Sequence, residues 1–296
     1  MEKTQKKAIG FALLAAVLYA LNSPFSKLLL EKVPAAMMAA FLYLGAGAGL
    51  FLIGLFQRAT GKKSREQPLT RRELPFTVGM VVLDIAAPIF LMLGLQRTTA
   101  ANAALLNNFE IVATTLIALA LFREAVSKRL WCAVTLVTLA SLILSFEDNS
   151  SLSFSRGSLY VLLACVCWGF ENNFTRKLSS KNPLEIVVIK GFGSGLGSLV
   201  VALLSGESFP KLTDVLCALL LGFVAYGLSI YFYIYAQRDL GAAKTSTYYA
   251  AAPFVGAALS LLIFRELPPV TFFIALPIMA LGAYLAAVEP MKTQTE

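Results

Sequence analysis

The chain has 296 residues, of which 58% are hydrophobic and only 14% charged, and its mean hydropathy of +0.74 is outside the usual range of soluble proteins. It contains no histidine, which excludes histidine metal sites, Ser-His-Asp or Cys-His nucleophile pairs and histidine proton relays. The formal charge of +8 comes from lysines and arginines that mostly lie between apolar segments. We therefore interpret the charge as a signal of membrane topology and expect no nucleic-acid partner.

Apolar segments separated by charged or turn-forming residues follow one another along the whole chain. About 20 helical residues span the roughly 30 Å hydrocarbon core of a bilayer, so these segments predict membrane-spanning helices, although the fifth is short. They lie near residues 8–30, 35–56, 74–95, 100–121, 130–146, 157–178, 184–204, 215–236, 242–264 and 269–288. The predicted fold class is an all-α membrane protein with ten transmembrane helices in a lipid bilayer.

Other classes of site have little support in the sequence. The four cysteines, at 132, 165, 167 and 217, lie in apolar runs without metal-type spacing, so we expect no metal site. No glycine-rich phosphate loop is present, so we expect neither a nucleotide nor another cofactor. We also expect no catalytic residues, and we interpret the chain as a non-enzyme.

The distribution of positive charge predicts that both termini are cytoplasmic. With this orientation, eighteen of the 25 lysines and arginines fall inside, including the cluster between Arg58 and Arg72, and six fall outside. The predicted location is the cell (plasma or inner) membrane.

Two stretches of the sequence resemble each other. Residues 19–34 align with residues 168–183 at an offset of 149, and residues 122–124 match residues 264–266, Phe-Arg-Glu in both, at an offset of 142. We therefore predict two five-helix repeats, over 1–149 and 150–296. An odd number of helices in each repeat inverts the second relative to the first, as in many secondary transporters.

Charged side chains within spanning segments cost about 2.5–3.5 kcal/mol each on insertion scales, so each needs a partner, a water-filled cavity or a function. Asp84 lies in the third segment, where Pro88 one turn later leaves a local structural role open. Glu110 lies in the fourth segment and shares a helical face with Asn107 and Thr114. One hypothesis is that Glu110 binds a substrate amine or couples protons, and the other is that it makes an interhelical hydrogen bond.

The second half contributes three further candidates. The repeat places the polar cluster that begins at Asn22 opposite the one that begins at Glu171, and equivalent clusters of inverted halves approach each other near the pseudo-two-fold axis. Lys190 either pairs with Glu171 or Glu185, or binds a substrate carboxylate. Tyr249 lies too deep in the ninth segment for an interfacial aromatic belt and is preferred over Tyr226 as a binding residue.

Several of these features together resemble the drug/metabolite transporter superfamily and, within it, the EamA family of ten-helix permeases. They are Tyr19 and Trp168 at the start of the halves, Ala100-Ala101-Asn102-Ala103-Ala104, Ala252-Pro253-Phe254, and the Arg-Glu pairs at 123 and 265. The resemblance implies an α-helical transporter of small organic metabolites, commonly an exporter, that works without ATP. One departure is Glu110-Ile111 where the family usually has a proline, so we expect a less kinked fourth helix.

We therefore predict a secondary transporter that exports a small metabolite, such as an amino acid or a related amino-bearing compound, by alternating access, with proton coupling as a hypothesis. An exporter of lipophilic cations or drugs is the alternative, and a membrane-embedded enzyme or a structural subunit explains less. The predicted substrate-binding or coupling residues are Asn22, Asp84, Asn107, Glu110, Glu171, Lys190 and Tyr249. A monomer suffices for this function, and the sequence leaves the oligomeric state open.

Overall fold

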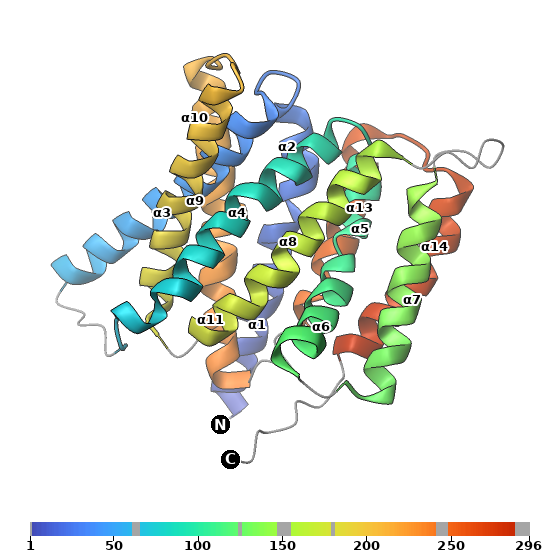
Figure 1. Cartoon of the computed structure of the whole chain (residues 1–296), viewed down its shortest axis with the longest axis horizontal. Helices are drawn as coiled ribbons and strands as arrows, with labels where there is room; N and C mark the ends of the chain where they lie inside the picture. The colour runs from blue at the N-terminus through green and yellow to red at the C-terminus, as the bar shows by residue number, and fades with distance from the viewer. Residues whose placement is uncertain are drawn as a thin grey trace.

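The structure is a computed structural model that describes residues 2–60, 66–123, 126–146, 155–178, 181–240 and 248–287, apart from the side chains of 2–5, 122 and 237–240 (Figure 1). Its regular elements are helices. In the first half they are α1 (Glu2–Ala20), α2 (Asn22–Leu29), α3 (Ala35–Ala59), the 3₁₀ turn η1 (Arg71–Glu73), α4 (Leu74–Leu95), α5 (Ala100–Leu106), α6 (Phe109–Phe122) and α7 (Lys128–Ser145). In the second half they are α8 (Arg156–Leu178), α9 (Pro183–Leu204), α10 (Leu212–Gly222), the π-helical turn η2 (Phe223–Leu228), α11 (Ser229–Leu240), α13 (Ala252–Phe264) and α14 (Val270–Ala287).

The all-α membrane class is confirmed. Within the described residues, eight helical stretches are long and apolar enough to cross a bilayer, and the apolar helix α13 is shorter. Helix α8 has 23 residues, enough to span, but carries Glu171, Arg176 and Lys177. Ten spans therefore remain a prediction. Residues 242–247 of the ninth predicted segment lie outside the described residues.

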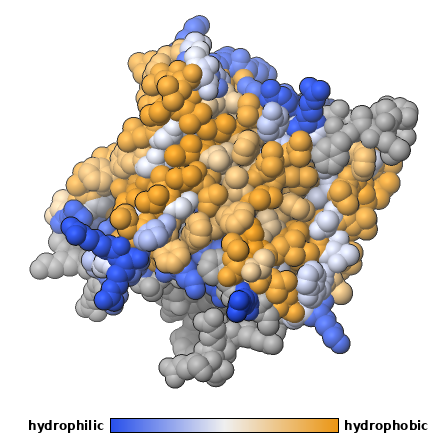
Figure 2. Space-filling view, viewed as in Figure 1, coloured by the Kyte–Doolittle hydropathy of each residue, from blue (hydrophilic) through white to orange (hydrophobic). Residues whose placement is uncertain are grey.

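The outer surface has the character of a protein surrounded by lipid. Large apolar side chains are exposed on many helices, with Leu204 at 84%, Leu262 at 73% and Phe56 at 71% of their accessible surface. Figure 2 shows an apolar band across the visible face, with hydrophilic residues gathered toward the top and bottom. Exposure of such a surface to water is unfavourable, so we infer that it contacts the hydrocarbon core of a bilayer.

Helices of the two halves pack against each other in pairs. The prominent contacts join α3 with α9, α4 with α8, α1 with α11, α5 with α13, and α7 with α14. Each pair takes one helix from residues 2–146 and one from residues 155–287. The bundle is therefore held together mainly across the two halves, and not within each half.

Small residues allow the closest of these approaches. A Cβ atom on Gly47 of α3 would lie 2.9 Å from the backbone nitrogen of Phe192, and one on Gly191 of α9 would overlap the backbone of Gly47. Because neither glycine has a side chain, the two backbones touch directly. This contact fixes the position of α9 relative to α3, and α9 contains Lys190.

The two halves also share local backbone features. Arg123 after α6 and Arg265 after α13 are separated by the repeat offset of 142 and are the positive-φ residues other than glycine in the described chain, at 54° and 53°. Each caps the end of its helix in the left-handed conformation, which costs a residue with a Cβ about 1 kcal/mol. Helices α3 and α9 begin at the equivalent prolines, with Pro34 as N-cap and Pro183 as first residue.

Candidate functional site

The first predicted segment is not one continuous helix, because α1 ends at Ala20 and α2 begins at Asn22. Pro24 has no backbone N–H to donate to Ala20, so the chain bends at this point. The side chain of Asn22 is buried and donates to the hydroxyl of Tyr226 at 3.1 Å, while its oxygen accepts from Ser26 at 2.9 Å. The bend therefore places Asn22 of the first half in contact with Tyr226 of the second half.

The fourth predicted segment is also interrupted, and the expectation of a less kinked helix is wrong. Helix α5 ends at Leu106 and α6 begins at Phe109, although this segment lacks the proline. The side chain of Asn108 donates to the carbonyl of Leu105 at 3.1 Å and so competes with the helical hydrogen bonds. The interruption places Glu110 in the first turn of α6.

Two more irregularities occur in the second half. The π turn η2 lies between α10 and α11 and contains the buried Tyr226. Tyr249 precedes α13, which begins only at Ala252 with Pro253 in its first turn. Wide or broken turns in spanning helices are common at functional sites, because they expose backbone and re-aim side chains. In this chain they coincide with predicted site residues in the first, fourth and ninth segments and with Tyr226 in the eighth.

Glu110 belongs to a polar cluster between α6 and α8. The side-chain amide nitrogen of Asn172 lies 2.5 Å from Glu110 Oε1 and 3.3 Å from the hydroxyl of Thr114. Close contact between the helices permits this, because a Cβ on Gly169 would lie 2.6 Å from the Cβ of Ala113. Glu110 remains partly accessible, unlike the neighbouring Asn107, which is buried with 6% exposure beside Cys165.

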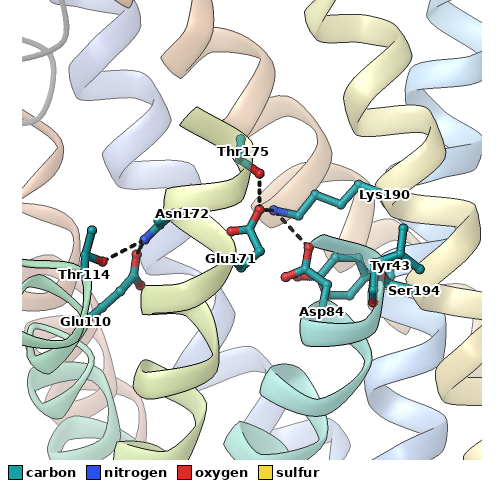
Figure 3. A network of polar contacts seen from close by, with 10 residues as sticks. Tyr43, Asp84, Glu110, Thr114, Glu171, Asn172, Thr175, Lys190 and Ser194 are labelled. Atoms are coloured by element: carbon teal, nitrogen blue, oxygen red, sulfur yellow. Dashed lines mark hydrogen bonds and ion pairs between the residues drawn. The ribbon is translucent and has the colours of Figure 1, made fainter. Parts of the chain in front are cut away.

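A second cluster lies on the other side of α8. Lys190 Nζ is 3.0 Å from Asp84 Oδ2 and 2.9 Å from Glu171 Oε1, so one ammonium bridges two carboxylates. Tyr43 donates to Asp84 Oδ1 at 2.9 Å, and the hydroxyl of Thr175 donates to Glu171. Figure 3 shows α8 between the two clusters, with Asn172 directed toward Glu110 and Glu171 directed toward Lys190.

Tyrosine rings connect the polar groups of the two halves. The ring of Tyr226 lies 5.2 Å from that of Tyr43 and 6.0 Å from that of Tyr19, measured between centroids. Tyr19 lies 5.8 Å from Tyr249, whose hydroxyl is 3.4 Å from Ser229 Oγ. These contacts link Asn22 through Tyr226 and Tyr43 to Asp84.

The seven predicted site residues therefore fall into groups. Asp84, Glu171 and Lys190 form one ion-paired cluster, Glu110 forms another with Asn172, Asn22 contacts Tyr226, and Asn107 and Tyr249 lie near the interruptions. The predicted ion pair of Lys190 with Glu171 is confirmed, whereas Glu185 instead accepts from the backbone of Leu69 at 3.1 Å. The inverted repeat also predicts that Asn22, Asn107, Glu110, Glu171 and Tyr249 line one central polar cavity. In the structure these residues fall into the separate groups just described.

Sequence reasoning misses several partners in these clusters. Tyr43 lies in a long apolar segment with no polar neighbour in helical register, so only the structure shows its contact with Asp84. The sequence favours Tyr249 over Tyr226, yet Tyr226 is the tyrosine that contacts both Asn22 and the ring of Tyr43. Among the described residues, no group of three or more Cys, Asp or Glu side chains is placed to hold a metal ion.

Comparisons with known proteins agree with this architecture. An uncharacterized transporter of Methanothermobacter thermautotrophicus is 24% identical over 268 residues, covering 85% of this chain and 78% of its own length. An uncharacterized transporter of Bacillus subtilis, YyaM, is 22% identical and covers 73% of each chain. A solved structure, described only as "Crystal structure of protein", matches with a TM-score of 0.68 and 18% identity over 95% of this chain and 96% of its own, which shows a shared fold.

The sequence pattern of one transporter family matches both halves. It covers residues 6–146 and again residues 155–288, which includes nearly all of the described helices. The two matches and the transporter relatives agree with the apolar surface and the interrupted helices. The chain is a multi-pass membrane protein that belongs to the EamA-like transporter family.

Proposed function

We propose that this transporter exports a small metabolite, such as an amino acid or a related amino-bearing compound, from the cell by alternating access, and that it is not an enzyme. The observation that supports this most is the position of Glu110. Glu110 as a whole residue is partly accessible and lies at a helix interruption, and its carboxylate accepts from the Asn172 amide, a neutral partner. A carboxylate held in this way can bind a substrate ammonium or exchange a proton for it.

Alternating access requires two units that move around a fixed site. The helix pairing and the matching left-handed turns at Arg123 and Arg265 support an inverted repeat with a pseudo-two-fold axis. In Figure 1, α1 begins at the end of the molecule opposite to the one where α8 begins. This opposition supports the proposed repeats at 1–149 and 150–296, and a monomer then contains both moving parts.

The proposed orientation places both termini in the cytoplasm of the cell membrane. The start of α1 and the end of α14 lie toward the same end of the bundle in Figure 1. The charge distribution supports assignment of that end to the inside, because Lys6 and Lys7 lie near the start of α1.

Export of lipophilic cations is a second candidate, favoured by one observation. The deep clusters contain three carboxylates, Asp84, Glu110 and Glu171, but one ammonium, and that ammonium is already paired with two of them. Because Lys190 is already paired, it opposes a cationic substrate less than an unpaired ammonium would. The aromatic faces of Tyr19 and Tyr249, which interact with Glu110, also suit a cation.

A metabolite-export screen distinguishes the two candidates. Cells that express the chain are compared with cells that express Glu110→Gln and Glu31→Gln, where Glu31 is an exposed carboxylate that undergoes the same chemical change. We expect export of an amino-bearing compound that Glu110→Gln abolishes and Glu31→Gln preserves. Resistance to lipophilic cations without such export would select the second candidate, and equal export by both variants would contradict a role for Glu110.

A further inference from the structure

The cluster of Asp84, Glu171 and Lys190 has more negative than positive charge. Its ammonium lies within 3.0 Å of one oxygen of each carboxylate, so all three groups act as one electrostatic unit. With both carboxylates ionised, the unit carries one net negative charge. Asp84 is fully buried, and the side chains of Glu171 and Lys190 are 4% and 11% exposed. A net charge buried at this depth costs several kcal/mol, so the cluster favours one additional positive charge.

The groups that surround the cluster do not supply that charge. Asp84 receives a hydrogen bond from the neutral Tyr43 of α3, and Glu171 receives one from the neutral Thr175 on its own helix. Further titratable groups that interact electrostatically with the cluster include Glu110 of α6, Tyr226 of η2 and Cys167 of α8. Glu110 is acidic and the other two are neutral, so none of these three groups adds a positive charge.

The missing charge is best supplied by a proton. The Lys190 ammonium already occupies the position between the two carboxylates, at 3.0 and 2.9 Å, so a metal cation has no place there unless it displaces the side chain. A proton needs no such space, because it adds to a carboxylate oxygen and forms an O–H bond. Lys190 remains an ammonium, and the cluster becomes neutral.

We propose that the Asp84–Lys190–Glu171 cluster is a proton-binding site in its own right, separate from Glu110, and that it holds one proton when the transporter contains no substrate. The proton comes from water and adds to a carboxylate oxygen of Asp84, the fully buried acid. Lys190 then remains paired with Glu171.

The position of the cluster gives this proton a structural consequence. Lys190 belongs to α9, which packs along α3, whereas Asp84 and Glu171 belong to the packed pair α4 and α8. The cluster therefore joins two helix pairs, and each pair contains one helix from each half. Uptake or loss of the proton changes how strongly the pairs are held together, which is the kind of contact that a rocking motion must rearrange.

Infrared spectroscopy tests this site without substrate. The full chain is reconstituted in phosphatidylethanolamine and phosphatidylglycerol vesicles in the Glu110→Gln background, and the carbonyl stretching band of protonated carboxylic acids is recorded near neutral pH. We expect a band from one buried acid. Because Glu110 is absent from every sample, the result does not depend on whether Glu110 couples transport.

Three added substitutions test the charge count. In this background, Asp84→Asn and Glu171→Gln should each abolish the band, because each leaves one carboxylate opposite one ammonium. Lys190→Gln should raise its intensity about twofold, because two acids then lack a cation and both become protonated. If either Asp84→Asn or Glu171→Gln fails to fold, the other variant still tests the proposal. Absence of the band in the Glu110→Gln background, or its persistence in either folded amide variant, would overturn the proposal.

Discussion

Glu171 and Asn172 are neighbours in sequence but serve different clusters. Successive residues of a helix point about 100° apart, so Asn172 is directed to Glu110 and Glu171 to Lys190 (Figure 3). Helix α8 thereby separates one carboxylate with a neutral partner from two carboxylates with a shared cation. Because of this separation, we propose different chemical tasks for Glu110 and for the Asp84–Lys190–Glu171 cluster.

At the scale of residues, Tyr43 is expected to stabilise the cluster. Tyr43→Phe removes a hydrogen bond of 2.9 Å to Asp84 and should lower the free energy of unfolding by about 1–3 kcal/mol, because a buried oxygen of Asp84 loses its donor. The measurement is thermal unfolding in detergent at neutral pH. Tyr284→Phe, at a side chain that is 58% exposed, is the matched control and should change little. Equal stability of the two variants would contradict the assigned contact.

Sequence reasoning identifies the charged residues of the site better than their contacts. Asp84, Glu110, Glu171 and Lys190 stand out because charge is rare in spanning segments, and that signal needs no structure. The contact between Asp84 and Lys190 joins residues of different halves, so it depends on how α4, α8 and α9 pack. No local pattern contains that information.

At the scale of elements, the ends of most helices follow from composition, but their interruptions do not. Helix α4 has the predicted bounds of 74 and 95, because charged and turn residues flank it. The break at Pro24 is visible in the sequence, whereas the break at Asn108 arises from a side chain that competes for a backbone carbonyl. The π turn around Tyr226 has no local sequence signal, because it depends on packing against other helices.

The contact between α3 and α9 depends on the absence of side chains. Gly191→Ala places a methyl group against the backbone of Gly47, so the helices must separate, and we expect a loss of about 1–3 kcal/mol in unfolding free energy. Gly10→Ala is the matched control, because a Cβ there meets no atom within 4 Å and alanine favours the helix by about 1 kcal/mol. The melting temperature should therefore fall for Gly191→Ala and rise for Gly10→Ala. A shift of the same sign for both would argue against direct backbone contact.

At the scale of the whole molecule, orientation can be tested at two exposed positions that are predicted to lie on opposite sides of the membrane. Arg72→Cys should be inaccessible and Lys211→Cys accessible to a membrane-impermeant maleimide added to intact cells, in a background without native cysteines. Permeabilised cells provide the control, because both positions should then react. Labelling of Arg72→Cys alone in intact cells would reverse the proposed topology.

The whole-molecule proposal also predicts how transport depends on charge at Glu110. Glu110→Gln keeps the side-chain shape and a hydrogen bond to Asn172 but cannot carry a titratable charge. If Glu110 only holds α6 against α8, the glutamine variant should transport substrate at nearly the wild-type rate. If Glu110 exchanges a proton for the substrate, the variant should fold and insert normally but fail to use a proton gradient.

The decisive measurement is proton-driven transport of the identified substrate in proteoliposomes that contain the wild-type chain, Glu110→Gln or the control Glu31→Gln. We predict that the wild type and Glu31→Gln respond to an imposed pH gradient, whereas Glu110→Gln loses this response and the pH dependence of substrate binding. Proton-driven transport by Glu110→Gln at nearly the wild-type rate would contradict the proposed coupling.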